Sequence, residues 1–179
     1  MEQEENQSEV KSYLTFKLGE EQFGVHVSQV LNILEMTPVT HVPKSPYYMK
    51  GVINLRGQVL PVIDSRLKFG MEEKDYTNNT CIIVMDLELE GEQVDIGAIV
   101  DEVISVVEIN ESQVEPPPSI GTSYNSDFIY GMARVDEEFV MLLDMQRVLS
   151  SDDMSELASH TGHAQEAAVN SAEKISDKK

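Results

Sequence analysis

The sequence predicts a mostly β protein in which one unit of short strands occurs twice. Three observations support this fold class: apolar and polar residues alternate with a period of two, glycine-containing turns separate the alternating segments, and the spacing of the first half recurs in the second. A chain of 179 residues is long enough to bury a core for both copies without a metal or a disulfide.

The repeat rests on two sets of matching positions. Gly51 and Asp64 are 13 residues apart, and so are Gly131 and Asp144. The second set relates five small or apolar residues of each half, Gly24, Val25, Val27, Val30 and Ile33 in one and Gly97, Ala98, Val100, Val103 and Val106 in the other. Each copy would hold four or five strands, and an open sheet of that size exposes its edges. We therefore expect each copy to curl into a small barrel.

The first copy follows a polar segment, residues 1–12, which we expect to be a disordered tail. It is predicted to contain a hairpin at 13–27 and a short helix, capped by Ser28, at 28–36. A third strand at 39–46 and a second hairpin at 52–64 follow. The second hairpin turns at Arg56 and Gly57, because glycine marks a turn between two apolar runs.

The second copy is predicted to begin with three strands, at 81–90, 94–103 and 106–109. An extended loop that starts at three prolines follows at 116–127, then a hairpin at 130–144 and a final helix at 150–160. Ser150 and Asp153 suit a capping box for that helix. The two lobes should span 13–150, and 151–179 should hold the C-terminal helix and a mobile tail.

The charge of the chain favours protein partners. The net charge is −19, and binding to nucleic acid or to anionic lipid needs a basic surface. Residues 13–69 hold six basic and four acidic side chains, whereas residues 70–150 hold three and 18. Such asymmetry selects partners, so it indicates recognition more than catalysis.

The cysteine content and the N-terminus predict a cytoplasmic protein. Cys81 is the only cysteine, so no disulfide forms within the chain. The first residues are acidic and polar where a secretory signal is basic and then apolar, and no apolar run approaches the roughly 20 residues of a membrane span.

Motifs for catalysis are missing from the sequence. It has no nucleophile elbow and no phosphate-binding glycine loop. His160 and His163 have a metal-like spacing but no third ligand nearby, and Cys81 has no cationic neighbour to activate its thiol. We expect no enzyme activity, no cofactor and no metal site.

Apolar residues offer a different kind of site. Val30, Val59 and Val103 fall at corresponding or facing positions of the two copies, and Arg56 lies beside Val59. Taken singly, each of these valines fits a core position better than a binding site. Taken together, they would line a groove between the lobes.

Several motifs resemble the CheW family of bacterial chemotaxis coupling proteins. The stretch "GVINLRGQVLPVIDSRLKFG" carries the most specific resemblance, with "FGVHVSQVLNIL", "IGAIVDEV" and "YGMARV…VMLLDMQRVL" beside it. The similarity covers residues 13–150 and implies two intertwined SH3-like five-stranded β barrels. Asn32 departs from the glutamate that family members often carry, which puts a charged contact at this position in doubt.

The resemblance also implies a function. Family members are non-enzymatic adaptors that join the cytoplasmic tips of methyl-accepting receptors to the regulatory domain of the histidine kinase CheA in membrane-associated arrays. The receptor tip, a helical hairpin, docks in the groove between the barrels. Carried onto this sequence, the receptor-binding residues are Val30, Arg56, Val59, Cys81 and Val103. Kinase contact or lobe geometry depends on Lys50, Gly51 and Gly131.

Other functions remain open from the residues alone. An apolar cleft also suits a small-molecule sensor, or an adaptor of a two-component pathway outside chemotaxis. A hydrolase would need a carboxylate pair such as Asp64 and Asp144, although structural capping at the ends of strands is the simpler role for both. The 29 residues after Ser150 are too few for a fused receiver domain of the CheV type.

Overall fold

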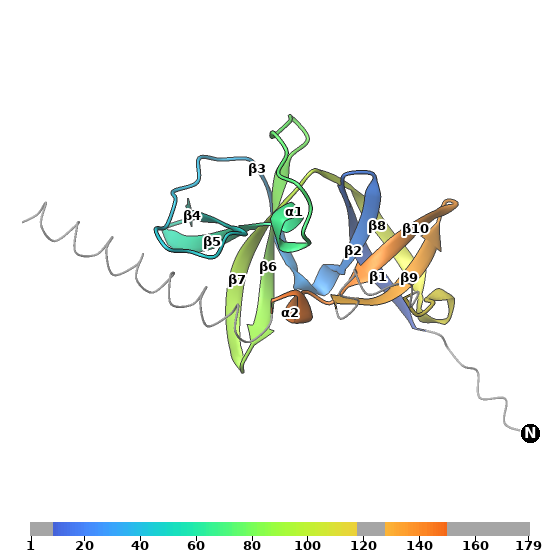
Figure 1. The fold of residues 1–179 in the computed structure, drawn as a ribbon. Helices are drawn as coiled ribbons and strands as arrows, with labels where there is room; N and C mark the ends of the chain where they lie inside the picture. The colour runs from blue at the N-terminus through green and yellow to red at the C-terminus, as the bar shows by residue number, and fades with distance from the viewer. Residues whose placement is uncertain (1–8, 118–127, 150–179) are drawn as a thin grey trace, which may run out of the picture.

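The computed structural model describes residues 9–117 and 128–149, which form ten strands in two five-stranded sheets (Figure 1). The strands are β1 (Val10–Leu18), β2 (Glu21–His26), β3 (Val30–Glu35), β4 (Met49–Leu55), β5 (Gln58–Asp64), β6 (Cys81–Leu89), β7 (Glu92–Val100), β8 (Glu102–Asn110), β9 (Ile129–Val135) and β10 (Glu138–Leu143). Short helices are α1 (Ser65–Lys68), α2 (Met145–Val148) and the 3-10 turns η1 (Val27–Gln29) and η2 (Glu111–Gln113). None of the helices in these ranges is long and apolar enough to span a membrane.

The two sheets share one architecture and exchange their strands. Lobe A has the strand order β8-β1-β2-β10-β9, and lobe B has the order β3-β6-β7-β5-β4. Each order becomes the other when β1–β5 are swapped with β6–β10, the strands of the two sequence copies. The intertwined barrels are therefore confirmed, but the expectation that each copy curls into a barrel of its own is wrong.

Short connections explain the exchange. β3 follows β2 after the three residues of η1, and β8 follows β7 after Asp101 alone. Connections of this length give the chain no room to return to the same sheet, so it crosses to the other lobe. Lobe A thus combines β1 and β2 with β8–β10, and pairing between copies, such as β1 with β8 and β2 with β10, holds it together.

Each sheet closes toward a barrel at equivalent places. Thr40, just beyond β3, bridges to Val52 on β4, and Glu115, just beyond β8, bridges to Met132 on β9. In lobe B, the bridge joins the segment after the edge strand β3 to the opposite edge strand β4, and in lobe A it joins the segment after β8 to β9. Two backbone hydrogen bonds of 2.8 or 2.9 Å form at each bridge, so these backbone groups at the sheet edges are paired within the chain.

Three apolar clusters fill the molecule. One lies within lobe A around Tyr13 and Leu142, and one within lobe B around Val62 and Ile82. The largest, which we call the shared core, joins side chains of both lobes, with Phe23 from lobe A among them. Burying a large apolar side chain contributes about 1.5–3 kcal/mol, so the shared core accounts for the close association of the lobes.

The predicted hairpins and most of the predicted strands are present, with two corrections to the first copy. Residues 28–36 form η1 and β3 instead of a helix, because the exposed and half-buried positions of β3 alternate and the strand pairs with β6. The predicted strand at 39–46 is reduced to the single Thr40 bridge, since prolines follow it and cannot donate hydrogen bonds to a sheet.

Other boundaries also differ from the prediction. β1 begins at Val10, so residues 10–12 belong to a strand and not to the N-terminal tail. The predicted strand at 94–103 is interrupted at Asp101, where the chain changes lobe. The helix predicted at 150–160 and most of the proline loop lie outside the described residues.

Candidate docking site

Exposed apolar side chains gather on two edge strands that hold equivalent places in the lobes. Leu31 and Ile33 on β3 are 55% and 43% exposed, and Ile104 and Val106 on β8 are 40% and 58% exposed. Ile33 and Val106 are matched positions of the sequence repeat. The same feature therefore occurs on both lobes.

The register of the strands shows which face these side chains occupy. Ile33 pairs with Ile83, and Val106 pairs with Leu14. Both partners belong to the shared core, and directly opposite residues of a strand pair lie on one face of the sheet. Ile33 and Val106 therefore extend the shared core outward into solvent.

Three of the predicted groove residues border the shared core at two places, because Val30 pairs with Met85 and Cys81 pairs with Glu35 at opposite ends of the β3–β6 pair. Val30 at the start of β3, Cys81 at the start of β6 and Val103 near the start of β8 are half-buried and pack against the shared core. The backbone N–H of Val103 lies close enough to the Cys81 sulfur to favour its charged form, so lobe A and lobe B approach each other at this point. We call these three residues, with Leu31, Ile33, Ile104 and Val106, the docking face.

Cys81 is a packing residue and not a reactive thiol. Burial raises the pKa of the Cys81 thiol above its usual value, and the hydrogen bond from Val103 only partly opposes that effect. The sulfur is therefore protonated at neutral pH and contributes apolar contact area, as the sequence predicted.

Arg56 and Val59 lie elsewhere, on the β4–β5 hairpin at the other end of the strand order of lobe B. Arg56 and Gly57 have φ values of 53° and 84°, as the two central residues of a type I′ turn do. Asn54 Oδ1 accepts the Gly57 N–H at 2.8 Å and stabilises the turn. Arg56 is thus a turn residue whose side chain is exposed to solvent.

Gly51 and Gly131 lie at the two closing bridges of the barrels. A Cβ atom on Gly51, whose φ is 145°, would lie 2.0 Å from the Thr40 carbonyl oxygen. A Cβ atom on Gly131 would lie 2.3 Å from Cγ1 of Val114. Each glycine lets the preceding segment cross closely over β4 or β9. Lys50, next to Gly51, forms an ion pair with Glu73.

Asp64 and Asp144 have equivalent structural roles. Asp64 Oδ1 accepts the N–H groups of Arg66 and Leu67, and Asp144 Oδ1 accepts those of Gln146 and Arg147. Each carboxylate thus caps a short helix, α1 or α2, in the way the capping alternative predicted. In the described ranges, no group of three or more His, Cys, Asp or Glu side chains is placed to hold a metal ion.

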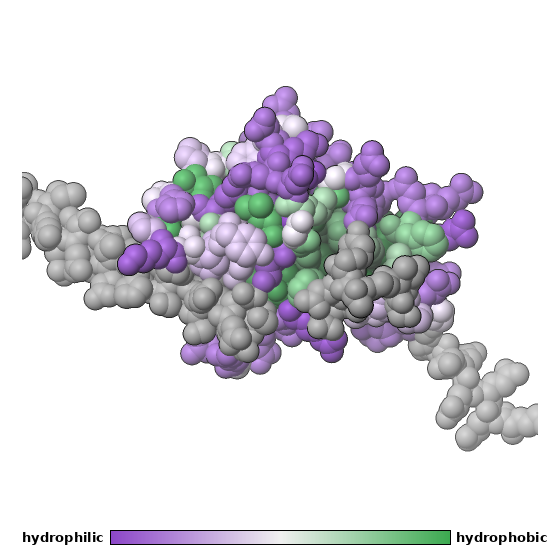
Figure 2. Space-filling view, in the orientation of Figure 1, coloured by the Kyte–Doolittle hydropathy of each residue, from purple (hydrophilic) through white to green (hydrophobic). Residues whose placement is uncertain are grey.

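A hollow lies between the lobes beside α1, and none of the predicted groove residues lines it. Its volume is about 920 Å³, and Phe23, Phe69, Phe128 and Met141 are among its lining residues. Phe23 of lobe A stacks on Phe69, which follows α1, with ring centroids 5.7 Å apart. Figure 2 shows apolar surface at this boundary between the lobes.

The edge-strand docking face and the exchanged barrels define a two-lobed β module with the surface of an interaction protein. Comparison with known proteins then identifies its family. The chain belongs to the CheW-like domain family, whose model matches residues 12–153.

Named relatives cover most of the chain. A chemotaxis protein CheW of Klebsiella aerogenes is 32% identical over 145 residues, which are 81% of this chain and 85% of that protein. A chemotaxis protein CheW of Bacillus subtilis is 31% identical over 78% of this chain and 86% of its own length. The solved scaffolding protein TtCheW from Thermoanaerobacter tengcongensis matches with a TM-score of 0.70 and 30% identity, over 81% of this chain and 96% of that one.

Proposed function

We propose that this protein is a chemotaxis scaffold that couples methyl-accepting receptors to the histidine kinase CheA and has no catalytic role of its own. The observation that carries the proposal is the docking face, the exposed apolar side chains that an edge strand of each lobe presents. The names of the relatives, chemotaxis proteins and a scaffolding protein, support the same function.

The docking face suits a helical partner. A helix that docks in an apolar groove buries anchor side chains spaced along one of its faces. Val30, Cys81 and Val103 offer half-buried contact area, and Leu31, Ile33, Ile104 and Val106 offer exposed area. A receptor tip, which is a helical hairpin, would bury these side chains at little conformational cost because the strands are already ordered.

Arg56 would add a charged contact outside the docking face, from the β4–β5 hairpin. Its guanidinium presents five donors that suit a carboxylate on a helix. Asn32 on β3 is neutral, and its side-chain oxygen accepts the N–H of Ile33 at 2.8 Å. Arg56 would therefore carry the main charge interaction with the receptor, while Lys50, Gly51 and Gly131 would serve kinase contact or lobe geometry.

Binding to receptor tips would bring the protein from the cytoplasm to membrane-associated arrays. The two alternatives, a small-molecule sensor and an adaptor outside chemotaxis, are less well supported. Relatives named as chemotaxis proteins match about four fifths of the chain at close to one third identity.

The proposal is tested by assembly of a ternary complex. The full chain, a receptor-tip fragment and the regulatory domain of CheA are mixed in pairs and together, then analysed by sedimentation velocity. We expect both pairs that include this protein to associate, and the three components to sediment as one larger species. If the receptor fragment and the kinase domain compete for the protein, or if neither binds, the coupling function is wrong.

A further inference from the structure

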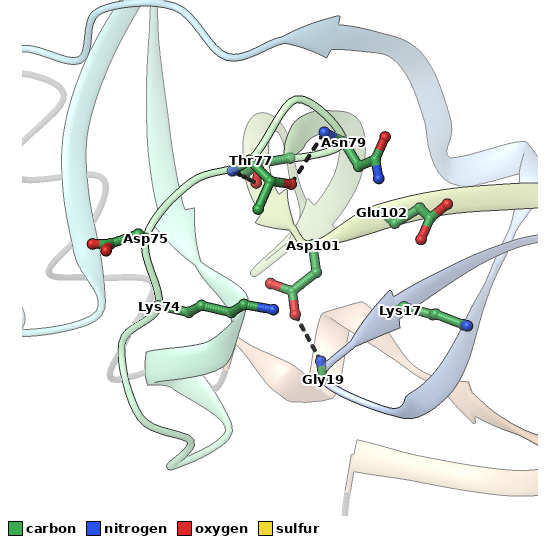
Figure 3. A pocket seen from close by; sticks show the side chains of 9 residues that line it. Lys17, Gly19, Lys74, Asp75, Thr77, Asn79, Asp101 and Glu102 are labelled. Atoms are coloured by element: carbon green, nitrogen blue, oxygen red, sulfur yellow. Dashed lines mark hydrogen bonds between the residues drawn. The ribbon is translucent and has the colours of Figure 1, made fainter.

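Asp101 is the only residue between β7 and β8, where the chain crosses from lobe B to lobe A, and both lobes hold its carboxylate. Arg66 of α1 in lobe B donates from Nε to Oδ1 at 2.8 Å and from Nη2 to Oδ2 at 2.7 Å. The N–H of Gly19, in the β1–β2 turn of lobe A, donates to Oδ2 at 2.7 Å (Figure 3). One side chain therefore connects three segments from two lobes.

We propose that Asp101 is a positioning residue that fixes the orientation of the two lobes and, with it, the spacing of β3 and β8 in the docking face. The orientation of the lobes is a property of the free protein. Its meaning for partner binding rests on the proposed scaffold function.

The contacts around Asp101 restrict its movement. The Arg66 and Asp101 side chains are 13% and 21% exposed. Nη1 of Arg66 also donates to the Glu72 carbonyl at 3.1 Å, and the backbone N–H of Asp101 donates to the Lys17 carbonyl at 3.1 Å. Two-point contact between a guanidinium and a carboxylate fixes relative orientation as well as distance.

The sequence repeat indicates that the fold itself does not need this ion pair. By the matches of the two copies, Ser28 occupies the place of Asp101 at the crossover from β2 to β3, and Gln146 occupies the place of Arg66. Both residues are exposed, and Ser28 hydrogen-bonds His26 in its own lobe. One crossover is thus built from uncharged residues, whereas the other is fixed by an ion pair.

Asp101 directly precedes β8, the strand that carries the lobe A part of the docking face. Val103, two residues further on, pairs with Phe16 in lobe A and contacts Cys81 of lobe B. Movement of the lobes about Asp101 would therefore displace β8 relative to β3. Burial by itself would raise the pKa of Asp101, but the hydrogen bonds from Arg66 and Gly19 lower it below its usual value, so the carboxylate is charged at neutral pH.

A distance measurement between the lobes tests the proposal in the free protein. Spin labels are attached through p-acetylphenylalanine at Glu90, in the β6–β7 turn of lobe B, and at Glu137, in the β9–β10 turn of lobe A, so that Cys81 is kept. Double electron–electron resonance should give a narrow distribution for the parent protein and a broader or shifted one for Asp101→Asn. Arg66→Gln, which breaks the pair from the other side, should give the same change.

Two further variants separate positioning from a general loss of stability. Glu102→Gln removes a charge from the exposed neighbouring residue and should leave the distribution unchanged. Arg66→Lys keeps the charge without the two-point contact and should give an intermediate width. Circular dichroism should show folded lobes in every variant.

Partner binding gives an independent outcome. If the docking face depends on lobe orientation, Asp101→Asn should bind the receptor-tip fragment at least about fivefold more weakly. A distribution that stays as narrow as that of the parent protein in both Asp101→Asn and Arg66→Gln overturns the proposal, whatever the binding result. If the distribution broadens but even the parent protein binds no receptor fragment, the scaffold function fails and the positioning role stands.

Discussion

Ile33 and Val106 occupy the same place in the two copies of the repeat, and both extend from the shared core into solvent. Ile33 lies on lobe B and Val106 on lobe A, so a partner that covers both must bridge the lobes. A surface of this kind depends on the exchanged fold, because a single copy contributes strands to both sheets.

Charged substitutions at these two positions should weaken docking strongly without unfolding the protein. Ile33→Asp and Val106→Asp each place a carboxylate where an apolar contact is expected, and we expect binding of a receptor-tip fragment to fall by about tenfold or more, as loss of an interface anchor does. Isothermal titration calorimetry measures the effect. Phe139→Asp is the matched control, since Phe139 is 55% exposed on β10 and lies outside the docking face. Equal binding by all three variants would contradict the assignment of the docking face.

Removal of the Arg56 side chain should weaken receptor binding moderately. Arg56→Ala loses an exposed charged contact, for which about twofold to fivefold is typical. Lys44→Ala is the control, because Lys44 and Arg56 are both exposed cations with positive φ values. It therefore matches Arg56→Ala in the lost charge and in the backbone strain. A receptor affinity that falls equally in the two variants would show a general effect of charge and no site at Arg56.

A methyl group at Gly51 should destabilise the fold. Gly51→Ala would place a carbon against the Thr40 carbonyl and force the closing bridge of lobe B apart, at a cost of about 2–4 kcal/mol in the free energy of unfolding. Gly57→Ala, where the new methyl meets open space but φ is +84°, should cost only about 1 kcal/mol, for the left-handed backbone. Urea denaturation compares the two. A smaller loss for Gly51→Ala than for Gly57→Ala would contradict the role of the close approach.

Asp86 on β6 and Asp95 on β7 lie directly opposite each other. Neutralising one of them should make the protein more stable. Burial and the nearby Asp86 carboxylate raise the pKa of Asp95 above its usual value, so its charged form is disfavoured in the folded state. Asp95→Asn should therefore raise stability at pH 7 by about 0.5 kcal/mol, a typical cost of like charges facing each other on a sheet.

The pH dependence of this gain follows from the raised pKa of Asp95. Protonation of folded Asp95 removes the repulsion, so the gain from Asp95→Asn should shrink as the pH falls through that pKa and disappear below the ordinary aspartate value of about 3.9. Thermal unfolding at pH 7 and pH 4 measures the trend. Glu88→Gln, opposite the neutral Gln93, serves as the control. A gain that is equal at both pH values would contradict the repulsion.

Local patterns in the sequence predicted much of the fold. The alternation in β1 and the glycine turn between β4 and β5 are set by neighbouring residues, so they are visible in the sequence. The exchange of strands is not, because it depends on pairing between distant segments such as β3 and β6. The same pairing turned the stretch after Ser28 into a strand, although Val30, Ile33 and Leu34 have helical spacing.

The candidate site was predicted in part for a similar reason. Cys81 and Val103 lie close to each other, whereas Val30 lies at the other end of the β3–β6 pair. The exposure of Leu31 and Ile104 depends on strand register. The match of Ile33 with Val106 was the one available signal for the exposed part of the face. The contact of Arg66 with Asp101 joins residues 35 positions apart, and no local pattern indicates it.

Reconstituted kinase activity tests the coupling function most directly. Receptors in membrane vesicles and CheA are incubated with labelled ATP, and phosphorylation of CheA is followed with and without this protein. We predict receptor-dependent activation only when the protein is added, with little activation by the Ile33→Asp variant and full activation by Phe139→Asp. Equal kinase activity with and without the protein would contradict its proposed role as a coupling scaffold.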